Sequence, residues 1–287
     1  MHILKLQGGL GNQLFEYAFA RAYGIRNDTE VKYDFDFFKT HTYLTYGLGY
    51  FNTILPKASK EECARFKIFK KQKGIIGRIY NPLFANSQKY IEEYTFHFLD
   101  EYMKNRKDSY FDGWWQSYKY FEDIHDILRK ELILKDEIQK PYTPYISKMN
   151  ATESVVIHIR RGDYANNPGT TKHHGLTSRE YYEYSINEIS KKIPHAYFFI
   201  FSDEIAWAKE HFKIPFPCEY VDVPTATPHE ELVAMSHAKH FIIANSTFSW
   251  WAAWLSNNKN KLVYAPKKWF NKGWNTDDLT PPEWKRV

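Results

Sequence analysis

Residues 154–164 read Ser-Val-Val-Ile-His-Ile-Arg-Arg-Gly-Asp-Tyr, a short apolar run that ends in charged residues. A continuous apolar run of this length is typical of a buried strand in a parallel sheet. Three further apolar runs in this half alternate with helical patterns, at residues 196–201, 241–244 and 262–265. Strands that alternate with helices predict a doubly wound α/β domain.

The first half of the chain shows the same alternation. A strand at residues 2–6 runs into a Gly-Gly-Leu-Gly turn, after which Asn12, a favoured N-cap residue, is predicted to start a helix. The remaining elements expected here are strands at 30–34 and 110–116, a helix at 120–134, and helices with long loops over 43–99. The segment Lys-Pro-Tyr-Thr-Pro at 140–144 suits a hinge. We therefore predict two domains, residues 1–142 and 143–287.

Composition and charge exclude several classes of protein. With 39 basic and 34 acidic residues, the net charge of +5 is too small and too evenly spread to indicate a nucleic-acid partner. Two distant cysteines, Cys63 and Cys218, exclude a disulfide framework and predict a reducing compartment. No signal-peptide core and no membrane-spanning run is seen, so we expect a cytoplasmic protein. The basic stretch Arg65–Arg78 predicts either a solvated face or a peripheral contact with anionic lipid at the inner membrane.

The arginines at the end of the first run are the strongest functional signal. Arg160 and Arg161 follow the predicted strand directly, and parallel α/β sheets bind ligands beyond the carboxyl ends of their strands. Paired guanidinium groups grip phosphate oxygens well, and Gly162 lets the backbone approach a ligand. The alternative is a structural cluster in which both arginines are paired with carboxylates.

Two more strand ends carry polar residues. Asn245, Ser246, Thr247 and Phe248 follow the run at 241–244, where a helix start can bind an anion or simply be capped. Asp203 follows the run at 196–201 and can accept hydrogen bonds from guanine or cap the next helix.

Metal and cofactor motifs are weak. Asp34-Phe-Asp36 has the D-x-D pattern, but no other acidic cluster supports a metal site. The histidines lack zinc-helix spacing, and the glycine turn at 8–11 does not fit the dinucleotide fingerprint, which disfavours a nicotinamide dehydrogenase. That turn does form a nest in which the amides of Asn12 and Gln13 can meet a ligand. No metal and no cofactor is expected.

Several motifs together resemble the bacterial α-1,2-fucosyltransferases, glycosyltransferase family 11. The blocks that carry the resemblance are Gly8-Gly-Leu-Gly-Asn-Gln-Leu-Phe-Glu-Tyr17, Asp112-Gly-Trp-Trp-Gln-Ser117, His158-Ile-Arg-Arg-Gly-Asp-Tyr164, Phe201-Ser-Asp203 and Ile242-Ile-Ala-Asn-Ser-Thr-Phe-Ser-Trp-Trp251. They occur in order over nearly the whole chain. The resemblance implies a GT-B fold, in which two Rossmann-like doubly wound domains face each other across a cleft.

The resemblance also implies an activity and its partners. The reaction would be inverting transfer of fucose from GDP-fucose to the 2-hydroxyl of a galactose-terminated oligosaccharide, such as an O-antigen repeat, without metal. The N-terminal domain would take the acceptor and the C-terminal domain GDP-fucose. Donor-binding residues carried over by motif are His158, Arg160, Arg161, Asp203, Asn245, Ser246, Thr247 and Phe248, and acceptor-side residues are Gly11, Gln13, Asp112, Trp115 and His174.

Catalytic roles are expected for three residues. Arg160 would neutralise the departing diphosphate, Asp163 is the first candidate for the general base, and Asn12 would position the transferred sugar. His174 and Asp112 are the other candidates for the base. Glu16 stands where the family often has glutamine. Fucosyl transfer in another linkage or to a protein, and a non-catalytic nucleotide-sugar-binding module, remain as alternatives.

Overall fold

The computed structural model describes residues 1–70, 89–104, 106–137 and 140–287. It divides the chain into two compact units: residues 1–133 with Asp277–Leu279, and residues 134–276 with 280–287. The division falls earlier than the predicted boundary at residue 142, and a short C-terminal segment returns to the first unit. There Asp278 accepts a hydrogen bond from the Phe98 amide at 3.1 Å.

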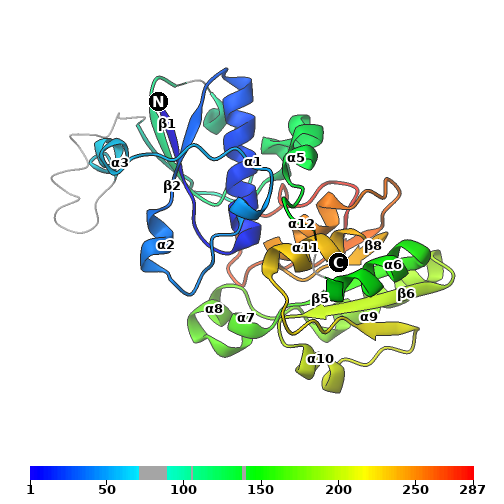
Figure 1. Cartoon of the computed structure of the whole chain (residues 1–287). Helices are drawn as coiled ribbons and strands as arrows, with labels where there is room; N and C mark the ends of the chain where they lie inside the picture. The colour runs from blue at the N-terminus through cyan, green and yellow to red at the C-terminus, as the bar shows by residue number, and fades with distance from the viewer. Residues whose placement is uncertain (71–88, 105, 138–139) are drawn as a thin grey trace. The chain divides into compact units, whose positions relative to one another are not determined.

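The first unit is built on a four-stranded parallel sheet with strand order β2-β1-β4-β3. Helices α1 and α3 lie on opposite sides of this sheet (Figure 1). Its elements are β1 (His2–Lys5), α1 (Leu10–Arg26), β2 (Val31–Asp34), α2 (Asp36–Thr40), α3 (Lys60–Lys67), β3 (Tyr90–Glu92), β4 (Ser109–Asp112) and α5 (His125–Glu131), with 3₁₀ turns at Leu48–Tyr50, Asp100–Met103, Tyr118–Tyr120 and Glu122–Ile124.

Alternation along the strands explains these two layers. Leu4 and Phe111 point to the α1 side, where Phe111 packs edge-on against Phe19 at 5.3 Å between ring centroids. Ile3 and Tyr110 point to the other side and form a small core with Phe66 of α3 and its neighbours.

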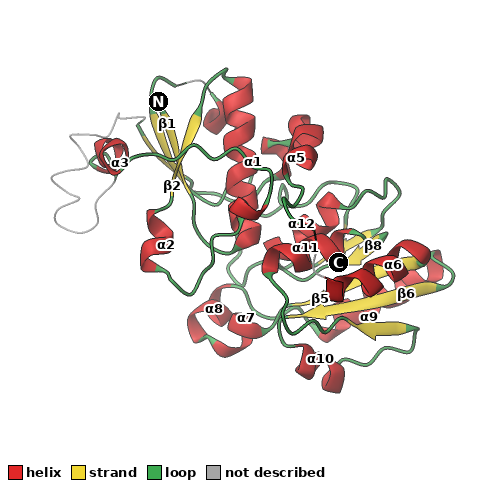
Figure 2. Cartoon of the chain, viewed as in Figure 1, coloured by secondary structure: helices red, strands yellow, loops and turns green. Residues whose placement is uncertain are grey.

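The second unit contains a six-stranded parallel sheet in the order β10-β9-β8-β5-β6-β7. Read in chain order this is the Rossmann arrangement, with α9 and α10 on one side and α6 and α11 on the other (Figure 2). Its elements are α6 (Thr143–Ala151), β5 (Glu153–Ile159), α7 (Gly162–Asn166), α8 (Pro168–His173), α9 (Arg179–Lys192), β6 (Ala196–Ser202), α10 (Ile205–His211), β7 (Cys218–Tyr220), α11 (Pro228–Ser236), β8 (His240–Ile242), α12 (Thr247–Leu255), β9 (Val263–Ala265) and β10 (Lys285–Arg286), with a 3₁₀ turn at Lys140–Tyr142.

Three local predictions were wrong. Helix α1 begins at Leu10 with Gly9 as its N-cap, so Asn12 lies inside the first turn, because the flexible glycine turn lets the helix start earlier. The helix expected over 120–134 is two 3₁₀ turns followed by the short α5. The segment 43–99 contributes a strand, β3, whose three residues are too few to show alternation.

Candidate active site

The second unit has its topological switch point between β5 and β8. The chain leaves β5 toward β6 on one side and reaches β8 on the other, so the loops after β5 and β8 diverge and leave a crevice. Arg160 and Arg161 follow β5, and Asn245 and Ser246 follow β8. The residues predicted to bind the donor therefore meet at the edge where such sheets bind nucleotides.

Arg160 lies between two carboxylates. Its Nη1 is 3.0 Å from Asp203 Oδ2, its Nη2 is 2.6 Å from Asp163 Oδ1, and the guanidinium lies 5.4 Å from the centroid of the Tyr164 ring. Burial lowers the pKa of Arg160, but the charges of Asp203 and Asp163 outweigh burial and the pKa is raised. The side chain is 32% exposed, so it is charged, held in place and reachable.

Arg161 points away from Arg160. Its Nε pairs with Glu204 Oε2 at 2.8 Å, and its guanidinium lies 3.6 Å from the Trp207 ring centroid, above α10. Both arginines therefore have carboxylate partners within the chain, as expected for the alternative of a structural cluster. The two guanidinium groups have different partners, and Arg160 is the one that directly follows β5 at the switch point.

Asp203 is bound to the arginine loop and does not cap α10. Its Oδ1 accepts the Arg161 backbone amide at 2.9 Å, and the N-cap of α10 is Glu204. A Cβ at Gly162 would lie 2.5 Å from Asp203 Oδ2, so this glycine permits the close approach of backbone and carboxylate. Burial raises the pKa of Asp203 although Arg160 opposes it.

His158 is a neutral, buried imidazole. Burial, helped by the charge of Arg160, lowers its pKa to about 3. Its Nδ1 is buried and has no hydrogen-bond partner among the described residues, and its ring lies 5.9 Å from that of Phe248. A buried, unpartnered ring nitrogen is a group that a ligand can satisfy.

Asn245 organises the surrounding loops. Its side-chain amide donates to the carbonyls of His174, Gly175 and Trp269, and its Oδ1 accepts from Thr177. The side chain is therefore committed to structure. Ser246 is buried and forms the N-cap of α12 without a side-chain capping bond, and Thr247 and Phe248 begin that helix with half-buried side chains.

Sequence reasoning missed Glu231 on α11. Its carboxyl is partly buried, and its pKa is raised to about 7 by burial and by the charge of Asp203, against the opposing charge of Arg160. A carboxyl whose pKa is raised close to a charge partner is typical of functional sites. The signal available in the sequence was only an acidic pair, Glu230-Glu231, in the first turn of a predicted helix.

The first unit has its own switch point, between β1 and β4. The loops that follow these strands are joined by two hydrogen bonds: Gln7 Nε2 donates to the Gly113 carbonyl at 3.3 Å, and Gln116 Nε2 donates to Asn12 Oδ1 at 3.0 Å. Asn12 is thus oriented by the loop after β4.

Two glutamates accept hydrogen bonds from the backbone amides of these loops. Glu16 Oε2 accepts the Gln7 amide at 2.9 Å, and Glu93 Oε2 accepts the amides of Trp114 and Trp115 at 2.6 and 2.9 Å. The Oε1 atom of each is buried without a partner among the described residues. Burial raises the pKa of Glu16 well above its usual range and that of Glu93 to about 7.

Of the predicted acceptor-side residues, four are buried in the first unit, whereas His174 lies in the second. Gln13 and Trp115 have no exposed surface: Gln13 bonds the carbonyls of Gly8 and Thr45, and Trp115 stacks on Phe19 at 4.1 Å between centroids. Gly11 is also buried. His174 lies in the second unit, stacked on Tyr164, and burial lowers its pKa.

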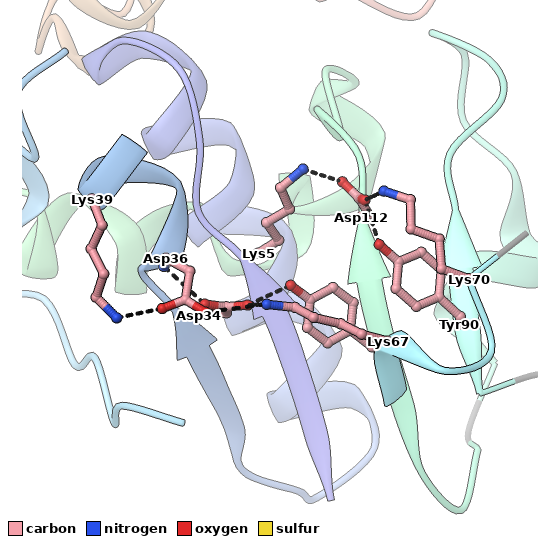
Figure 3. Close-up of polar contacts among 9 residues, drawn as sticks. Lys5, Asp34, Asp36, Lys39, Lys67, Lys70, Tyr90 and Asp112 are labelled. Atoms are coloured by element: carbon pink, nitrogen blue, oxygen red, sulfur yellow. Dashed lines mark hydrogen bonds and ion pairs between the residues drawn. The ribbon is translucent and has the colours of Figure 1, made fainter. Parts of the chain in front are cut away.

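Asp112 belongs to a lysine–aspartate network at the end of the first sheet (Figure 3). It pairs with Lys5 at 2.9 Å and Lys70 at 3.2 Å and accepts the Tyr90 hydroxyl at 2.6 Å. Burial raises the pKa of Asp112, but the bond from Tyr90 and the lysine charges outweigh it, and the pKa is lowered. Such a carboxylate takes up a proton poorly.

The D-x-D motif belongs to a second, separate group of contacts in the same region (Figure 3). Asp34 accepts the Tyr110 hydroxyl at 2.6 Å and pairs with Lys67, and Asp36 pairs with Lys39 and Lys67. The carboxylates of Asp34 and Asp36 are therefore both paired with lysine ammonium groups. Within residues 1–70, 89–104, 106–137 and 140–287, no three His, Cys, Asp or Glu side chains converge as metal ligands.

Comparison with known proteins identifies the family of this chain. The model of "Glycosyl transferase family 11" matches residues 2–287. The chain belongs to glycosyltransferase family 11. Among its relatives, an "Alpha-1,2-colitosyltransferase" of Escherichia coli is 32% identical, with 99% of this chain and 98% of that protein covered. The "O-antigen biosynthesis glycosyltransferase WbnK" of Escherichia coli is 30% identical over 97% and 98%.

Solved structures share the fold of this family 11 chain. A mutant of Arabidopsis thaliana FUT1 in complex with GDP has a TM-score of 0.55 at 10% identity, over 98% of this chain and 74% of that one. NodZ α-1,6-fucosyltransferase soaked with GDP-fucose has a TM-score of 0.50 at 12% identity, over 88% and 92%. The fold is the GT-B type, as predicted from the family resemblance.

The structure describes only part of the stretch that is predicted to contact a membrane. Residues 71–78 of the basic stretch Arg65–Arg78 lie outside the described residues. Among the helices that the structure describes, none has the length and apolar character needed to cross a bilayer.

Proposed function

We propose that this family 11 enzyme transfers fucose from GDP-fucose to the 2-hydroxyl group of a β-galactoside, with inversion and without a metal ion. The observation that carries the proposal is Arg160, a charged and reachable guanidinium at the switch point of a Rossmann-type sheet. A glycan such as an O-antigen repeat is the proposed acceptor, because a relative at 30% identity is named an O-antigen biosynthesis glycosyltransferase.

The donor site would be formed by the second unit. Arg160 would bind the diphosphate, with Asp163, whose side chain is 48% exposed, giving way to the phosphate oxygens. His158, Asp203 and the newly identified Glu231 offer ring nitrogen and carboxylate acceptors for the N–H groups of guanine. The first turn of α12, at Ser246 and Thr247, presents amides to phosphate, and the Phe248 ring packs beside the base.

The chemistry is a single displacement. The acceptor oxygen forms a bond to the anomeric carbon while the bond from that carbon to the β-phosphate oxygen breaks, and GDP departs with the electron pair. Arg160 would neutralise the charge that develops on GDP. The acceptor proton passes to a base, and Asn12, held by Gln116, would position the reacting sugar.

Asp163 is the preferred base among the three candidates. The pKa of Asp112 and that of the half-buried His174 are both lowered, so both accept a proton weakly. Asp163 is exposed and 2.6 Å from Arg160, so it lies beside the group that would hold the donor.

One relative favours a second donor. The Escherichia coli relative at 32% identity is named a colitosyltransferase, and colitose is the 3-deoxy form of fucose. GDP-colitose is therefore the alternative donor for the same reaction.

The test is a product analysis. The purified chain is incubated with GDP-fucose or GDP-colitose and a panel of β-galactosides, with and without EDTA, and the linkage is read by NMR. We expect an α-1,2-linked product from GDP-fucose and undiminished turnover in EDTA. GDP binding without release of a glycosylated product would identify a non-catalytic binding module, and another linkage would overturn the α-1,2 assignment.

A further inference from the structure

A solvent-open pocket lies beside the carboxyl end of β2 in the first unit. It holds about 610 Å³ and is walled by the end of β2, the start of α2, the segment 57–59 and the first turns of α3. The carboxyl edge of a parallel sheet is where such units bind ligands. None of the residues assigned above to the donor lines it.

The carboxylates in the pocket wall all have partners within the first unit. Asp34 and Asp36 are held by Lys67 at 2.8 and 3.2 Å, and Asp36 also by Lys39 (Figure 3). Lys32 pairs with Glu62 at 2.6 Å. The fourth, Glu61, is bound by the Ser59 hydroxyl at 2.8 Å.

Three wall cations form no direct ion pair among the described residues. Lys57, Lys60 and Arg65 form no ion pair with any carboxylate that the structure describes. The segments outside the described residues, 71–88, 105 and 138–139, contain no aspartate or glutamate in the sequence, so they supply no carboxylate partner either. The wall has five cations (Lys32, Lys39, Lys57, Lys60 and Arg65) and four carboxylates (Asp34, Asp36, Glu61 and Glu62), so it has a small excess of positive charge, which an anionic ligand would neutralise.

Aromatic rings continue this surface. A neighbouring cavity of about 480 Å³ shares Phe35, Lys39 and Lys57 with the pocket and is also lined by Phe38 and Tyr46. Phe35 and Phe38 both meet Tyr46 edge-on, at 5.1 and 5.8 Å between centroids.

Lys57 joins the charged and the aromatic parts. Its Nζ lies 5.9 Å from the centroid of Phe35. Aromatic faces pack against the C–H faces of sugars, and ammonium groups bind carboxylate or phosphate. A sugar ring that carries an acidic substituent matches both parts at once.

We propose that this pocket binds an anionic group, a carboxylate or a phosphate, on the saccharide acceptor. The proposal rests on the proposed function in that it makes the first unit the acceptor side. A lipid surface fits less well, because Phe35, Phe38 and Tyr46 are partly buried within the cavity wall and do not project for insertion into a bilayer.

The test measures binding without the donor, by calorimetry on the full chain. The probes are a galactose-terminated trisaccharide with one glucuronic acid residue, the same trisaccharide with a phosphate in its place, and the neutral parent. The variants are Lys57→Glu and, as a control on α5, Lys130→Glu, whose exposed side chain lies outside the pocket. We expect at least one acidic probe to bind tighter than the parent, with an affinity that falls as salt rises.

Lys57→Glu should weaken the acidic probe about fivefold or more and leave the neutral parent unchanged, and Lys130→Glu should change neither. Equal binding of all three probes, or no effect of Lys57→Glu, would overturn the proposal. The proposal would also be overturned if Lys57→Glu no longer bound phosphatidylglycerol vesicles but still bound the saccharides as the parent chain does. A chain that binds the acidic probe but transfers no sugar would refute the proposed function and leave the pocket assignment standing.

Discussion

The single positive charge of Arg160 lies between the carboxylates of Asp163 and Asp203, so the effect of replacing Arg160 follows from the loss of that charge. Without the guanidinium, Asp163 and Asp203 would repel both each other and the donor diphosphate. We expect Arg160→Ala to lower kcat/KM by about 100-fold or more, measured with saturating acceptor. The control is Arg179→Ala, which removes an exposed arginine paired with Glu183. An Arg160→Ala enzyme with most of its activity would remove the diphosphate assignment.

Asp163 has two possible roles that kinetics can separate. As the base, it is needed for the chemical step, so Asp163→Asn should lower kcat by about 100-fold while GDP binding stays the same or tightens, because a competitor for Arg160 is lost. As a mere partner of Arg160, it would leave kcat intact and change only donor affinity. Single-turnover rates and GDP titration distinguish the outcomes, and unchanged kcat would exclude Asp163 as the base.

At the scale of elements, the loop after β4 contacts the first turn of helix α1 through a hydrogen bond. Gln116 Nε2 donates to Asn12 Oδ1, so Gln116→Leu should remove this bond, orient the asparagine side chain less well and lower kcat about tenfold at unchanged donor KM. If Gln116 acts only through Asn12, the double variant with Asn12→Ala should be no slower than Asn12→Ala alone. Additive losses would show that Gln116 has a separate role.

Elements with a strong apolar pattern were predictable from the sequence. The run that ends at Arg160 predicted β5 and the run at 196–201 predicted β6, because long buried strands need continuous apolar residues, and the apolar run at 241–244 marked the shorter β8. Strands β3 and β10 have three and two residues, and their pairing depends on neighbours that no local pattern reveals. The start of α1 was misplaced because Gly9 replaces the expected side-chain cap.

The site was predictable as a set of strand ends but not as a set of contacts. The sequence placed Arg160, Asp203 and Asn245 directly after predicted strands, and the sheet order shows that these strands are neighbours. It could not show that Arg161 turns to Glu204 or that Asn245 is committed to loop carbonyls, because these depend on side-chain directions. Glu231 escaped notice since its environment comes from β5 and β6, far away in the chain.

Over the whole molecule, both units keep unpartnered polar atoms buried near their carboxyl edges. His158 Nδ1 in the second unit and Oε1 of Glu16 and Glu93 in the first have no hydrogen-bond partner among the described residues. Such groups cost stability, and these three lie near the carboxyl ends of the strands, where parallel sheets bind ligands. Stability and pH should therefore be coupled through the sites.

Glu93 makes that coupling measurable. Its folded-state pKa is raised from 4.5 to about 7, so the protein carries no penalty below about pH 4.5 and loses up to about 3 kcal/mol as the pH rises through 7. Gln is neutral at every pH, so the stability of Glu93→Gln relative to the parent should rise by about that amount between pH 4.5 and pH 8.5 in urea titrations. Glu122→Gln, an exposed control in the same unit, should show no such trend. If the difference between Glu93→Gln and the parent stayed constant with pH, Glu93 would have to be ionised normally in the folded protein, and the loops around Asn12 would rest on a charged carboxylate.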